Sequence, residues 1–311
     1  MLRRLLLAAS ESGRLRQVLT SAPYARGVVS RYVAGDNAAD AVAAARRLRA
    51  SGLLVSLDHL GEDTTSKEAA AAVAAEYLAL LERLAGEGLT AGAAVEVSVK
   101  PTAVGLGLPE HGEKTALDHI GRICSAARDA GTVVTVDMEE HRHVEATLRL
   151  VRDLRADFPG LGCVIQSQLR RAAADCGALL RPGSRVRLVK GAYQAPEEVA
   201  FAARHDVDRS YARCLRILMN GQGYPMIATH DPRLLAIAAA QAELAGRGPG
   251  SFEYQMLYGV RPEEQRRLAA AGAQVRVYLP YGSDWYGYLV RRLAERPANV
   301  AFFLRSLASR R

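Results

Sequence analysis

The sequence predicts an α/β protein, a TIM-type (β/α)8 barrel preceded by N-terminal helices. Eight short apolar runs rich in β-branched residues occur after residue 50, and longer stretches with apolar residues at three-to-four spacing separate most of them. Eight strand–helix units in about 250 residues match such a barrel, whose parallel strands are buried on both faces and are therefore almost continuously apolar. A doubly wound sheet is the structural alternative, and the absence of a G-x-G-x-x-G motif after the first strand counts against it.

The elements follow in order along the chain. Residues 1–50 are predicted to form a helical segment with helices at 2–9, 13–19 and 37–50, the last capped by Asp36 or Asn37. Residues 51–311 are predicted to form the barrel as one catalytic domain. Its strands are predicted at residues 53–57, 94–99, 132–136, 163–165, 186–189, 225–228, 251–257 and 274–279. Its helices are predicted at residues 67–84, 117–130, 144–155, 197–219, 232–245 and 285–295.

Composition and charge exclude several classes of protein. A chain of 311 residues that is 49% hydrophobic can bury a sizeable core and is too apolar for intrinsic disorder. No stretch approaches eighteen consecutive apolar residues, so a transmembrane helix is not expected. The net charge is +8, but the arginines are dispersed and no nucleic-acid-binding motif is present, so nucleic acid is not an expected partner. The basic excess is interpreted as a solvated surface that favours anionic lipid or an acidic partner.

Cysteines and the N-terminus indicate the compartment. The four cysteines have neither zinc-knuckle nor redox-dithiol spacing, which fits a reducing cytosol. The N-terminus MLRRLLLAAS has too short an apolar run for a signal peptide. A mitochondrial targeting segment is the alternative, because Glu11 is the only carboxylate among the first 35 residues.

Polar and ionisable residues follow every predicted strand, at the end where barrel enzymes keep their active sites. Lys100 and Lys190, two of only four lysines, occur there. Each is a candidate for Schiff-base chemistry or for a fixed cation beside an anionic ligand, and a structural ion pair at the rim is the alternative. Gly191 would let a ligand approach the backbone, and Arg187 could help to hold a phosphate.

Asp137 and His230 are further candidates at strand ends. The strand before Asp137 is apolar apart from threonine, so its carboxylate needs a cationic or hydrogen-bonding partner. It is either an active-site carboxylate or a helix N-cap, and His230 is either a ligand contact or a loop histidine. Glu140, His141 and His143 diverge on a helix, so no metal site is expected.

The last predicted helix carries an unusual set of residues on one face. Tyr288, Arg291, Arg292 and Glu295 recur at three-to-four spacing. Two guanidiniums can bind a small carboxylate while Tyr288 packs over it and Glu295 steadies one arginine. Six Arg-Arg pairs occur in the chain, but only this pair has the tyrosine and the glutamate so placed.

Together these motifs resemble the proline dehydrogenase family, flavoenzymes that oxidise L-proline to 1-pyrroline-5-carboxylate. The similarity extends over about residues 52–304, through SLDHLGE, VSVKPTA, VDMEEH, RLVKGAY, ATHD, FEYQMLYGV, VRVYLPYG and YLVRRLAE. The resemblance implies a distorted (βα)8 barrel with FAD at its carboxyl-end face and a final helix over the substrate. It further implies hydride transfer to flavin N5 and reoxidation by a membrane quinone as electron acceptor.

The resemblance also implies a role for each matching position. Asp137, Arg187 and Lys100 are the implied catalytic residues, with Lys100 also beside the substrate. Arg291 and Arg292 match the carboxylate-binding pair, and Tyr278, Tyr288 and Leu257 match the wall around the proline ring. The implied cofactor-binding positions are Met138, Gln166, Arg187, Val189, Lys190, Gly191, Ala192, Thr229, His230 and Glu295.

Three positions depart from the family pattern, namely Gln194, Asp231 and Pro101, and they bear on flavin packing. Tyr278 favours proline over its 4-hydroxy derivative. The implied partners are L-proline, a membrane quinone and a separate 1-pyrroline-5-carboxylate dehydrogenase. The expected location is cytoplasmic, with peripheral contact at the inner membrane face. The alternatives are oxidation of hydroxyproline or another cyclic imino acid, a Schiff-base aldolase or lyase using Lys100 or Lys190, and a non-catalytic or DNA-associated barrel.

Overall fold

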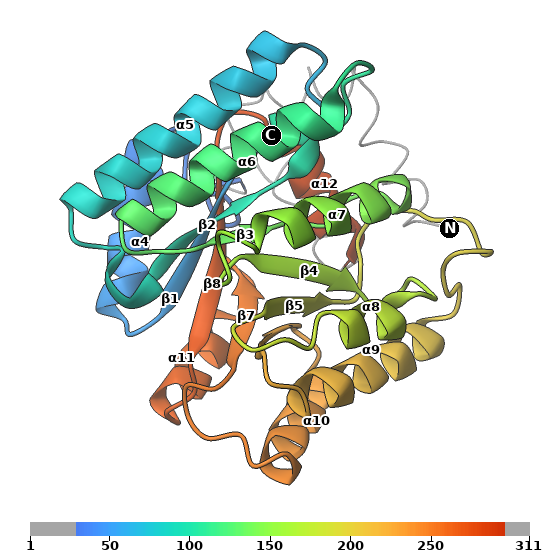
Figure 1. The fold of residues 1–311 in the computed structure, drawn as a ribbon. Coiled ribbons are helices and arrows are strands. Elements are labelled where there is room, and N and C mark those ends of the chain that lie inside the picture. The colour runs from blue at the N-terminus through green and yellow to red at the C-terminus, as the bar shows by residue number, and fades with distance from the viewer. Residues whose placement is uncertain (1–28, 296–311) are drawn as a thin grey trace, which may run out of the picture.

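Eight parallel strands close into a barrel in which each strand pairs with the next and the last pairs with the first (Figure 1). A computed structural model describes residues 29–295, with side chains as far as Arg292. The strands are β1 (Leu54–His59), β2 (Val95–Val99), β3 (Val134–Val136), β4 (Gly162–Gln166), β5 (Arg185–Val189), β6 (Tyr224–Ala228), β7 (Glu253–Leu257) and β8 (Val275–Tyr281). All eight predicted strands are confirmed, with small differences at their ends.

Helices surround the barrel and connect its strands (Figure 1). They are α4 (Ala38–Ala50), α5 (Lys67–Gly86), α6 (Gly112–Asp129), α7 (Val144–Leu154), α8 (Ala172–Ala178), α9 (Arg204–Met219), α10 (Pro232–Leu244), α11 (Pro262–Ala270) and α12 (Trp285–Glu295). Three short 3-10 helices are η1 (Ala91–Ala93), η2 (Pro101–Val104) and η3 (His141–His143).

The helix predicted at 197–219 is wrong at its start, because α9 begins only at Arg204. The preceding residues return to the end of β4 instead. Leu169 and Ala200 form an isolated β-bridge, and Phe201 N donates to Gln168 O at 2.8 Å. The short helices α8 and α11 follow β4 and β7, where helices were expected as parts of the eight strand–helix units but without stated bounds.

The N-terminal segment is tied to the barrel where the structure describes it. Of the two caps predicted for α4, Asn37 is the observed one, since its side chain accepts from Asp40 N at 3.0 Å. Just before it, Ala34 N donates to Pro280 O of β8 at 2.9 Å. The helices predicted at 2–9 and 13–19 lie outside the described residues, and the domain division at residue 50 stays a prediction.

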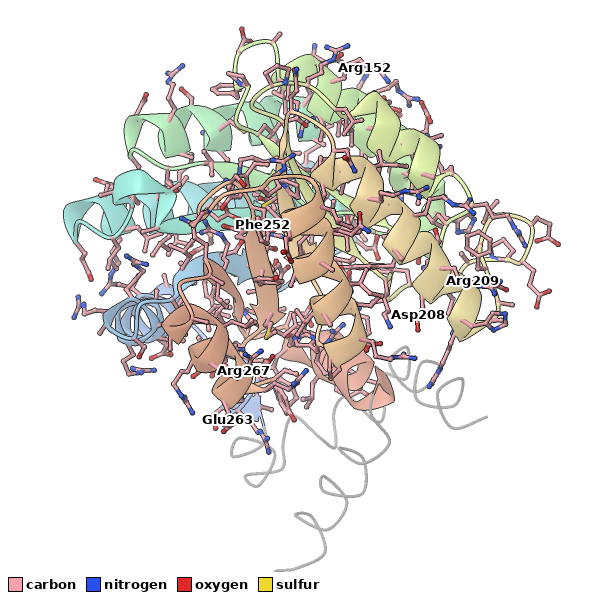
Figure 2. The ribbon with its side chains drawn as sticks, turned by 90° about the horizontal axis from the view of Figure 1, so that it is seen from below. Arg152, Asp208, Arg209, Phe252, Glu263 and Arg267 are labelled. Atoms are coloured by element: carbon pink, nitrogen blue, oxygen red, sulfur yellow. The ribbon has the colours of Figure 1, made fainter. Side chains whose placement is uncertain are left out.

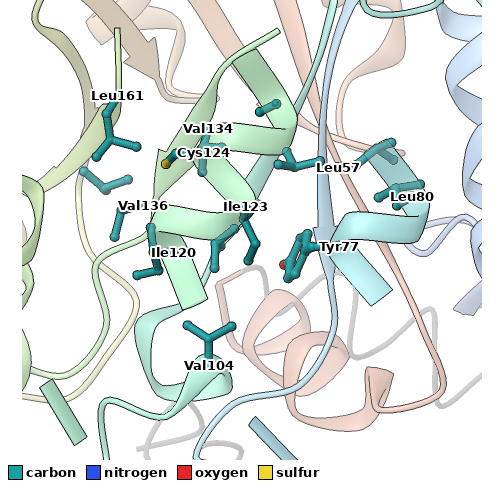
Figure 3. Close-up of a cluster of buried hydrophobic side chains, with 14 of the residues drawn as sticks. Leu57, Tyr77, Leu80, Val104, Ile120, Ile123, Cys124, Val134, Val136 and Leu161 are labelled. Atoms are coloured by element: carbon teal, nitrogen blue, oxygen red, sulfur yellow. The ribbon is translucent and has the colours of Figure 1, made fainter. Parts of the chain in front are cut away.

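An apolar core fills the space between the strands and the surrounding helices. Figure 3 shows one part of it, where side chains of α5 and α6 meet those of β1 and β3. Leu80, Ile120 and Ile123 are fully buried there. Because burying one such side chain stabilises a fold by about 1.5–3 kcal/mol, this layer holds the helices against the barrel.

The inside of the barrel differs from the prediction of strands that are apolar on both faces. Side chains alternate along a strand, so Val95, Val97 and Val99 face the helices while Glu96 and Ser98 face the interior. Contacts between distant strands identify that interior as polar: Arg185 Nη2 of β5 donates to Glu96 Oε2 of β2 at 2.7 Å.

Buried ion pairs make this polar interior possible. Arg276 of β8 donates from Nε to Glu253 Oε1 at 2.7 Å and from Nη2 to Glu253 Oε2 at 3.0 Å. Its Nη1 donates to Val55 O at 3.0 Å. Charges removed from water are tolerated when opposite charges and hydrogen bonds satisfy them, so these pairs form a fixed polar floor below the carboxyl ends of the strands.

Charged side chains are spread over the described surface. Figure 2 labels Arg152 on α7, Arg209 on α9 and Arg267 on α11, three separate helices around the barrel. Many are paired with acids, as Arg267 Nη2 is with Glu264 Oε1 at 2.7 Å. The part of the chain that the structure describes contains no helix that is both long and apolar enough to cross a membrane.

Candidate active site

A pocket opens at the carboxyl end of the barrel, between the strand ends and α12, and its empty space is about 270 Å³ when the solvent at its mouth is included. Three residues predicted for the site, Lys100, Tyr288 and Arg291, line it, and its other lining residues are Leu60, Gly61, Glu62, Asp284 and Gly287. Arg292 is not among the lining residues.

Lys100 follows β2 and carries a buried ammonium group. Its Nζ donates to Asp58 Oδ1 of β1, and both side chains are almost inaccessible to solvent. Burial raises the pKa of Asp58 to about 6, although Lys100 opposes the shift. Burial alone would lower the pKa of Lys100, but the carboxylates of Asp58 and Asp137 raise it above its usual value. Lys100 is therefore a fixed cation, and this charge state disfavours its use as a Schiff-base nucleophile.

Asp137 lies at the end of β3 with its carboxylate directed across the barrel. Oδ1 accepts from Arg187 Nη1 of β5 at 2.6 Å and from Ser98 Oγ at 2.8 Å. Oδ2 accepts from Tyr278 OH of β8 at 2.6 Å. These partners favour the active-site interpretation of Asp137 over a helix N-cap. Burial raises the pKa of Tyr278 well above its usual value, so the phenol stays protonated as a donor.

Arg187 spans the interior and joins this group to the polar floor. In addition to Asp137, it donates from Nε to Gln255 Oε1 at 2.6 Å and from Nη2 to Ser56 Oγ at 3.2 Å. Since β1, β7 and the residue directly after β3 each contribute a partner, the guanidinium has a single well-defined position. Gln255 and Ser56 had no role in the prediction.

Arg291 on α12 is paired with Glu62 of the loop after β1. Arg291 Nη1 donates to Glu62 Oε1 at 2.5 Å, and Tyr193 OH donates to Glu62 Oε2 at 2.8 Å. Burial would raise the pKa of Glu62, but Arg291 and Lys100 hold it below its usual value. The Arg291 guanidinium also lies 5.5 Å from the centre of the Tyr193 ring. The sequence suggested that Glu295 steadies one arginine of the pair. In the structure Glu62 holds Arg291, and the side chain of Glu295 lies outside the described residues.

The second arginine of the pair packs differently. The Arg292 guanidinium lies 5.2 Å from the centre of the Tyr288 ring, a cation–π contact within one helix. Tyr288 is itself buried at the pocket wall. The structure thus brings Tyr288, Arg291 and Lys100 to one pocket and places Arg292 beside the tyrosine.

The predicted cofactor residues gather at the neighbouring ends of β4, β5 and β6. Gln166 lies in register with Val189, and its Nε2 donates to Glu139 O at 2.7 Å, while its Oε1 is buried and has no hydrogen-bond partner among the described residues. His230 Nε2 accepts from Leu257 N at 2.9 Å. Thr229, directly after β6, and Met138, two residues after β3, are also buried.

Lys190 forms ion pairs at the rim. Its Nζ lies 2.6 Å from Asp208 Oδ1 and 3.1 Å from Asp231 Oδ2. Asp231, one of the departures from the family pattern, also caps α10 by accepting from Arg233 N at 3.0 Å. Lys190 therefore forms the ion pairs at the rim that were the structural alternative for this residue.

Gly191 follows Lys190 with a φ of 112°, a backbone conformation that a side chain would strain. A Cβ atom at this position would lie 2.4 Å from the Gln168 side chain. Gln168 Nε2 in turn donates to Tyr193 O at 2.9 Å. The glycine keeps the backbone of this loop, including Ala192, close against the barrel rim.

A family model described as "Proline dehydrogenase" matches residues 41–305. The chain is 39% identical over 277 residues to "Proline dehydrogenase 1" of Bacillus subtilis, covering 89% of each chain. It is 36% identical over 309 residues to "Proline dehydrogenase" of Deinococcus radiodurans, covering 98% of this chain and 97% of the relative. The solved structure of proline utilization A (PutA) from Bdellovibrio bacteriovorus, inactivated by N-propargylglycine, is similar with a TM-score of 0.80 and 26% identity over 87% of this chain and 33% of that one. The chain belongs to the proline dehydrogenase family.

Proposed function

We propose that the protein oxidises L-proline to 1-pyrroline-5-carboxylate with FAD as its cofactor. The observation that carries the proposal is the small pocket that brings the cations of Lys100 and Arg291 together with Tyr288, at the catalytic end of a barrel of this family. Proline is a small anion-bearing ring, and the pocket offers positive charge for its carboxylate and an aromatic wall for its ring.

Arg291 and Arg292 bind the proline carboxylate in this proposal. Because Glu62 already holds Arg291, the substrate carboxylate competes with Glu62 for the guanidinium or shares it. Tyr278, Tyr288 and Leu257 enclose the ring. The Tyr278 hydroxyl is fixed by Asp137, which leaves the ring of this tyrosine as a rigid part of the wall and supports proline over its bulkier 4-hydroxy derivative.

Lys100 controls the protonation of the substrate. A buried ammonium disfavours a second cation nearby, so proline binds with its amine neutral, as the loss of electrons from the ring nitrogen and its neighbouring carbon requires. Asp58 keeps Lys100 charged, and Asp137 lies within its electrostatic reach. These three residues set the charge of the pocket before the substrate enters.

The residues at the ends of β4–β6 fit a flavin. Gln166 Oε1 is a buried acceptor that lacks a donor within residues 29–292, and a donor on a bound ligand would satisfy it. The backbone at Gly191 lies close to the Gln168 side chain. The other residues of the proposed contact set are Met138, Arg187, Val189, Lys190, Ala192, Thr229, His230 and Glu295. When bound, FAD supplies the two-electron acceptor for the substrate C–H bond.

The proposal extends to partners and location. The proposed final electron acceptor is a membrane quinone, and a separate 1-pyrroline-5-carboxylate dehydrogenase would consume the product. The net charge of +8 supports a cytoplasmic protein with transient contact at an anionic inner membrane face.

A steady-state assay with purified protein tests the function. With L-proline and a soluble quinone, we expect quinone reduction and a product that has lost two hydrogens from proline. Trans-4-hydroxy-L-proline should be used less efficiently. Borohydride trapping of a substrate adduct on Lys100 or Lys190, with no quinone reduction, would overturn the proposal in favour of a Schiff-base lyase.

A further inference from the structure

Thr102 connects the loop after β2 to the loop after β1. It is fully buried two residues after Lys100. Its Oγ1 accepts from Asp63 N at 3.0 Å, and its carbonyl accepts from Thr64 N at 3.2 Å and from Thr64 Oγ1 at 2.9 Å. Asp63 has a φ of 55°, which is uncommon for a residue with a side chain. The Thr102 contacts hold this strained residue in place.

Glu139 connects the same threonine to the loop after β3. The Glu139 side chain is buried, with Oε2 accepting from Thr102 N at 2.9 Å and Oε1 lying 2.7 Å from Thr102 Oγ1. The Glu139 carbonyl accepts from Gln166 Nε2 of β4 at 2.7 Å. No ion pair forms at this carboxyl group in the part of the chain that the structure describes, so its burial rests on Thr102.

These contacts join four consecutive strand ends through one buried pair. Each of the four carries a residue of the proposed site: Glu62, which holds Arg291, precedes Asp63 directly. Lys100 precedes Thr102 by two residues, Asp137 precedes Glu139 by two, and Gln166 ends β4. Movement of the Thr102–Glu139 pair therefore shifts the groups that hold the substrate carboxylate and set the pocket charge.

We propose that Thr102 and Glu139 are positioning residues for the proline site, acting through Lys100 and through the Glu62–Arg291 pair. The substrate named here rests on the function proposed above. Neither side chain lines the pocket, so neither is a catalytic residue. A displacement of one ångström in such supporting groups is enough to lower catalytic efficiency about a hundredfold in enzymes, so a loss of one order of magnitude is readily measured.

Glutamine is a conservative substitution for Glu139, because the carboxyl group is expected to be mainly protonated at neutral pH. Burial raises the pKa of Glu139 to about 8, although the hydrogen bonds from Thr102 oppose the shift and Glu62 and Lys100 act in opposite directions. At neutral pH the group is mainly a neutral acid, with one oxygen accepting from Thr102 N and the other bonded to the Thr102 hydroxyl. A glutamine side chain keeps both contacts: its carbonyl accepts from Thr102 N, and its amide donates to the Thr102 hydroxyl oxygen, which reverses the direction of that bond.

Kinetics of paired variants test the proposal. Thr102→Val and Glu139→Leu remove the side-chain bonds and should each raise KM for L-proline about tenfold, with kcat changed less than about threefold, because groups that bind substrate and transition state alike are displaced. Thr102→Ser and Glu139→Gln keep the bonds and should stay within about twofold of the parent protein. Glu140→Ala, a change at the neighbouring and partly exposed glutamate, is the matched control.

Amide hydrogen exchange gives a readout that does not depend on activity. A peptide covering residues 60–66 should exchange faster in Thr102→Val, where Asp63 N loses its acceptor, and in Glu139→Leu, where Thr102 is no longer held in place, and should be unchanged in Thr102→Ser and Glu139→Gln. Unchanged exchange and KM in the first two variants overturn the positioning role, as does an equal defect in the conservative ones. If the parent protein does not oxidise proline but the variants show the expected differences in exchange, the proposed substrate is wrong and the connection between the loops is still supported.

Discussion

Lys100 and Arg291 depend on carboxylates that lie far away in the sequence. Lys100 is held by Asp58, 42 residues earlier, and Arg291 by Glu62, 229 residues earlier. Without such a partner a buried ammonium loses its proton, and a guanidinium on a surface helix has many rotamers. The two carboxylates therefore determine which charge the pocket presents and where.

The arginine pair provides the first prediction. Arg291→Ala and Arg292→Ala should each lower kcat/KM for L-proline by a factor that corresponds to about 2–5 kcal/mol, because each removes a donor to the substrate carboxylate. Arg266→Ala, at an exposed Arg-Arg pair on α11, should leave kcat/KM unchanged. Near-normal kcat/KM in both α12 variants would refute carboxylate binding by this helix.

Asp58 provides a prediction on pH dependence. The carboxylate raises the pKa of Lys100 against burial, so Asp58→Asn should lower that pKa and let Lys100 lose its proton at a less alkaline pH. The alkaline fall of kcat/KM should then begin at lower pH than in the parent protein. In the parent protein, protonation of Asp58 below its pKa of about 6 should weaken the same pair. Identical pH profiles of the two proteins would contradict this role.

The sequence singled out residues with a local signal and missed those defined by distant partners. Lys100 was visible because lysine is rare in this chain, and Arg291 because of its helical pattern with Tyr288. Glu62 and Glu139 have no such local signal, since their partners lie on other loops. Their roles depend on the loops after β1 and β3 lying close together in the closed barrel, which the sequence alone does not show.

At the scale of elements, strands were predictable and loops were not. Each strand contains large apolar residues and most contain β-branched ones, so all eight were recognised. The start of α9 was wrong because the tertiary bridge between Leu169 and Ala200 outweighs local helical periodicity. The polar interior was also missed, because single charges such as Glu96 and Arg276 look like interruptions of an apolar run until the barrel brings them together.

The polar floor predicts a contrast in stability. Arg276→Met leaves Glu253 buried without its partner and should lower the free energy of unfolding by about 3–5 kcal/mol. Arg149→Met breaks the exposed pair with Glu113 and should cost less than about 1 kcal/mol. Urea denaturation of the two variants measures the difference. Equal losses would show that the interior charges do not stabilise the barrel.

At the scale of the whole molecule, the two ends of the barrel have different roles: one stabilises the fold and the other carries the proposed site. At the end where the strands begin, charged side chains are paired with one another inside the barrel. At the end where the strands stop, charged side chains line the pocket. α12 covers this pocket with Tyr288 and Arg291, while buried Val29, Tyr32 and Val33 from before α4 belong to the same apolar cluster as Tyr288. Both ends of the described chain therefore contribute to the cover of the proposed site.

Anaerobic addition of L-proline to the purified protein, followed by its visible spectrum, tests the central claim most directly. The account predicts flavin absorption bands before the addition and their bleaching afterwards, since proline would deliver two electrons to the cofactor. D-proline provides the control for stereospecific binding. A colourless protein that stays inactive after FAD is supplied, or flavin bands that L-proline leaves unchanged, would contradict the account.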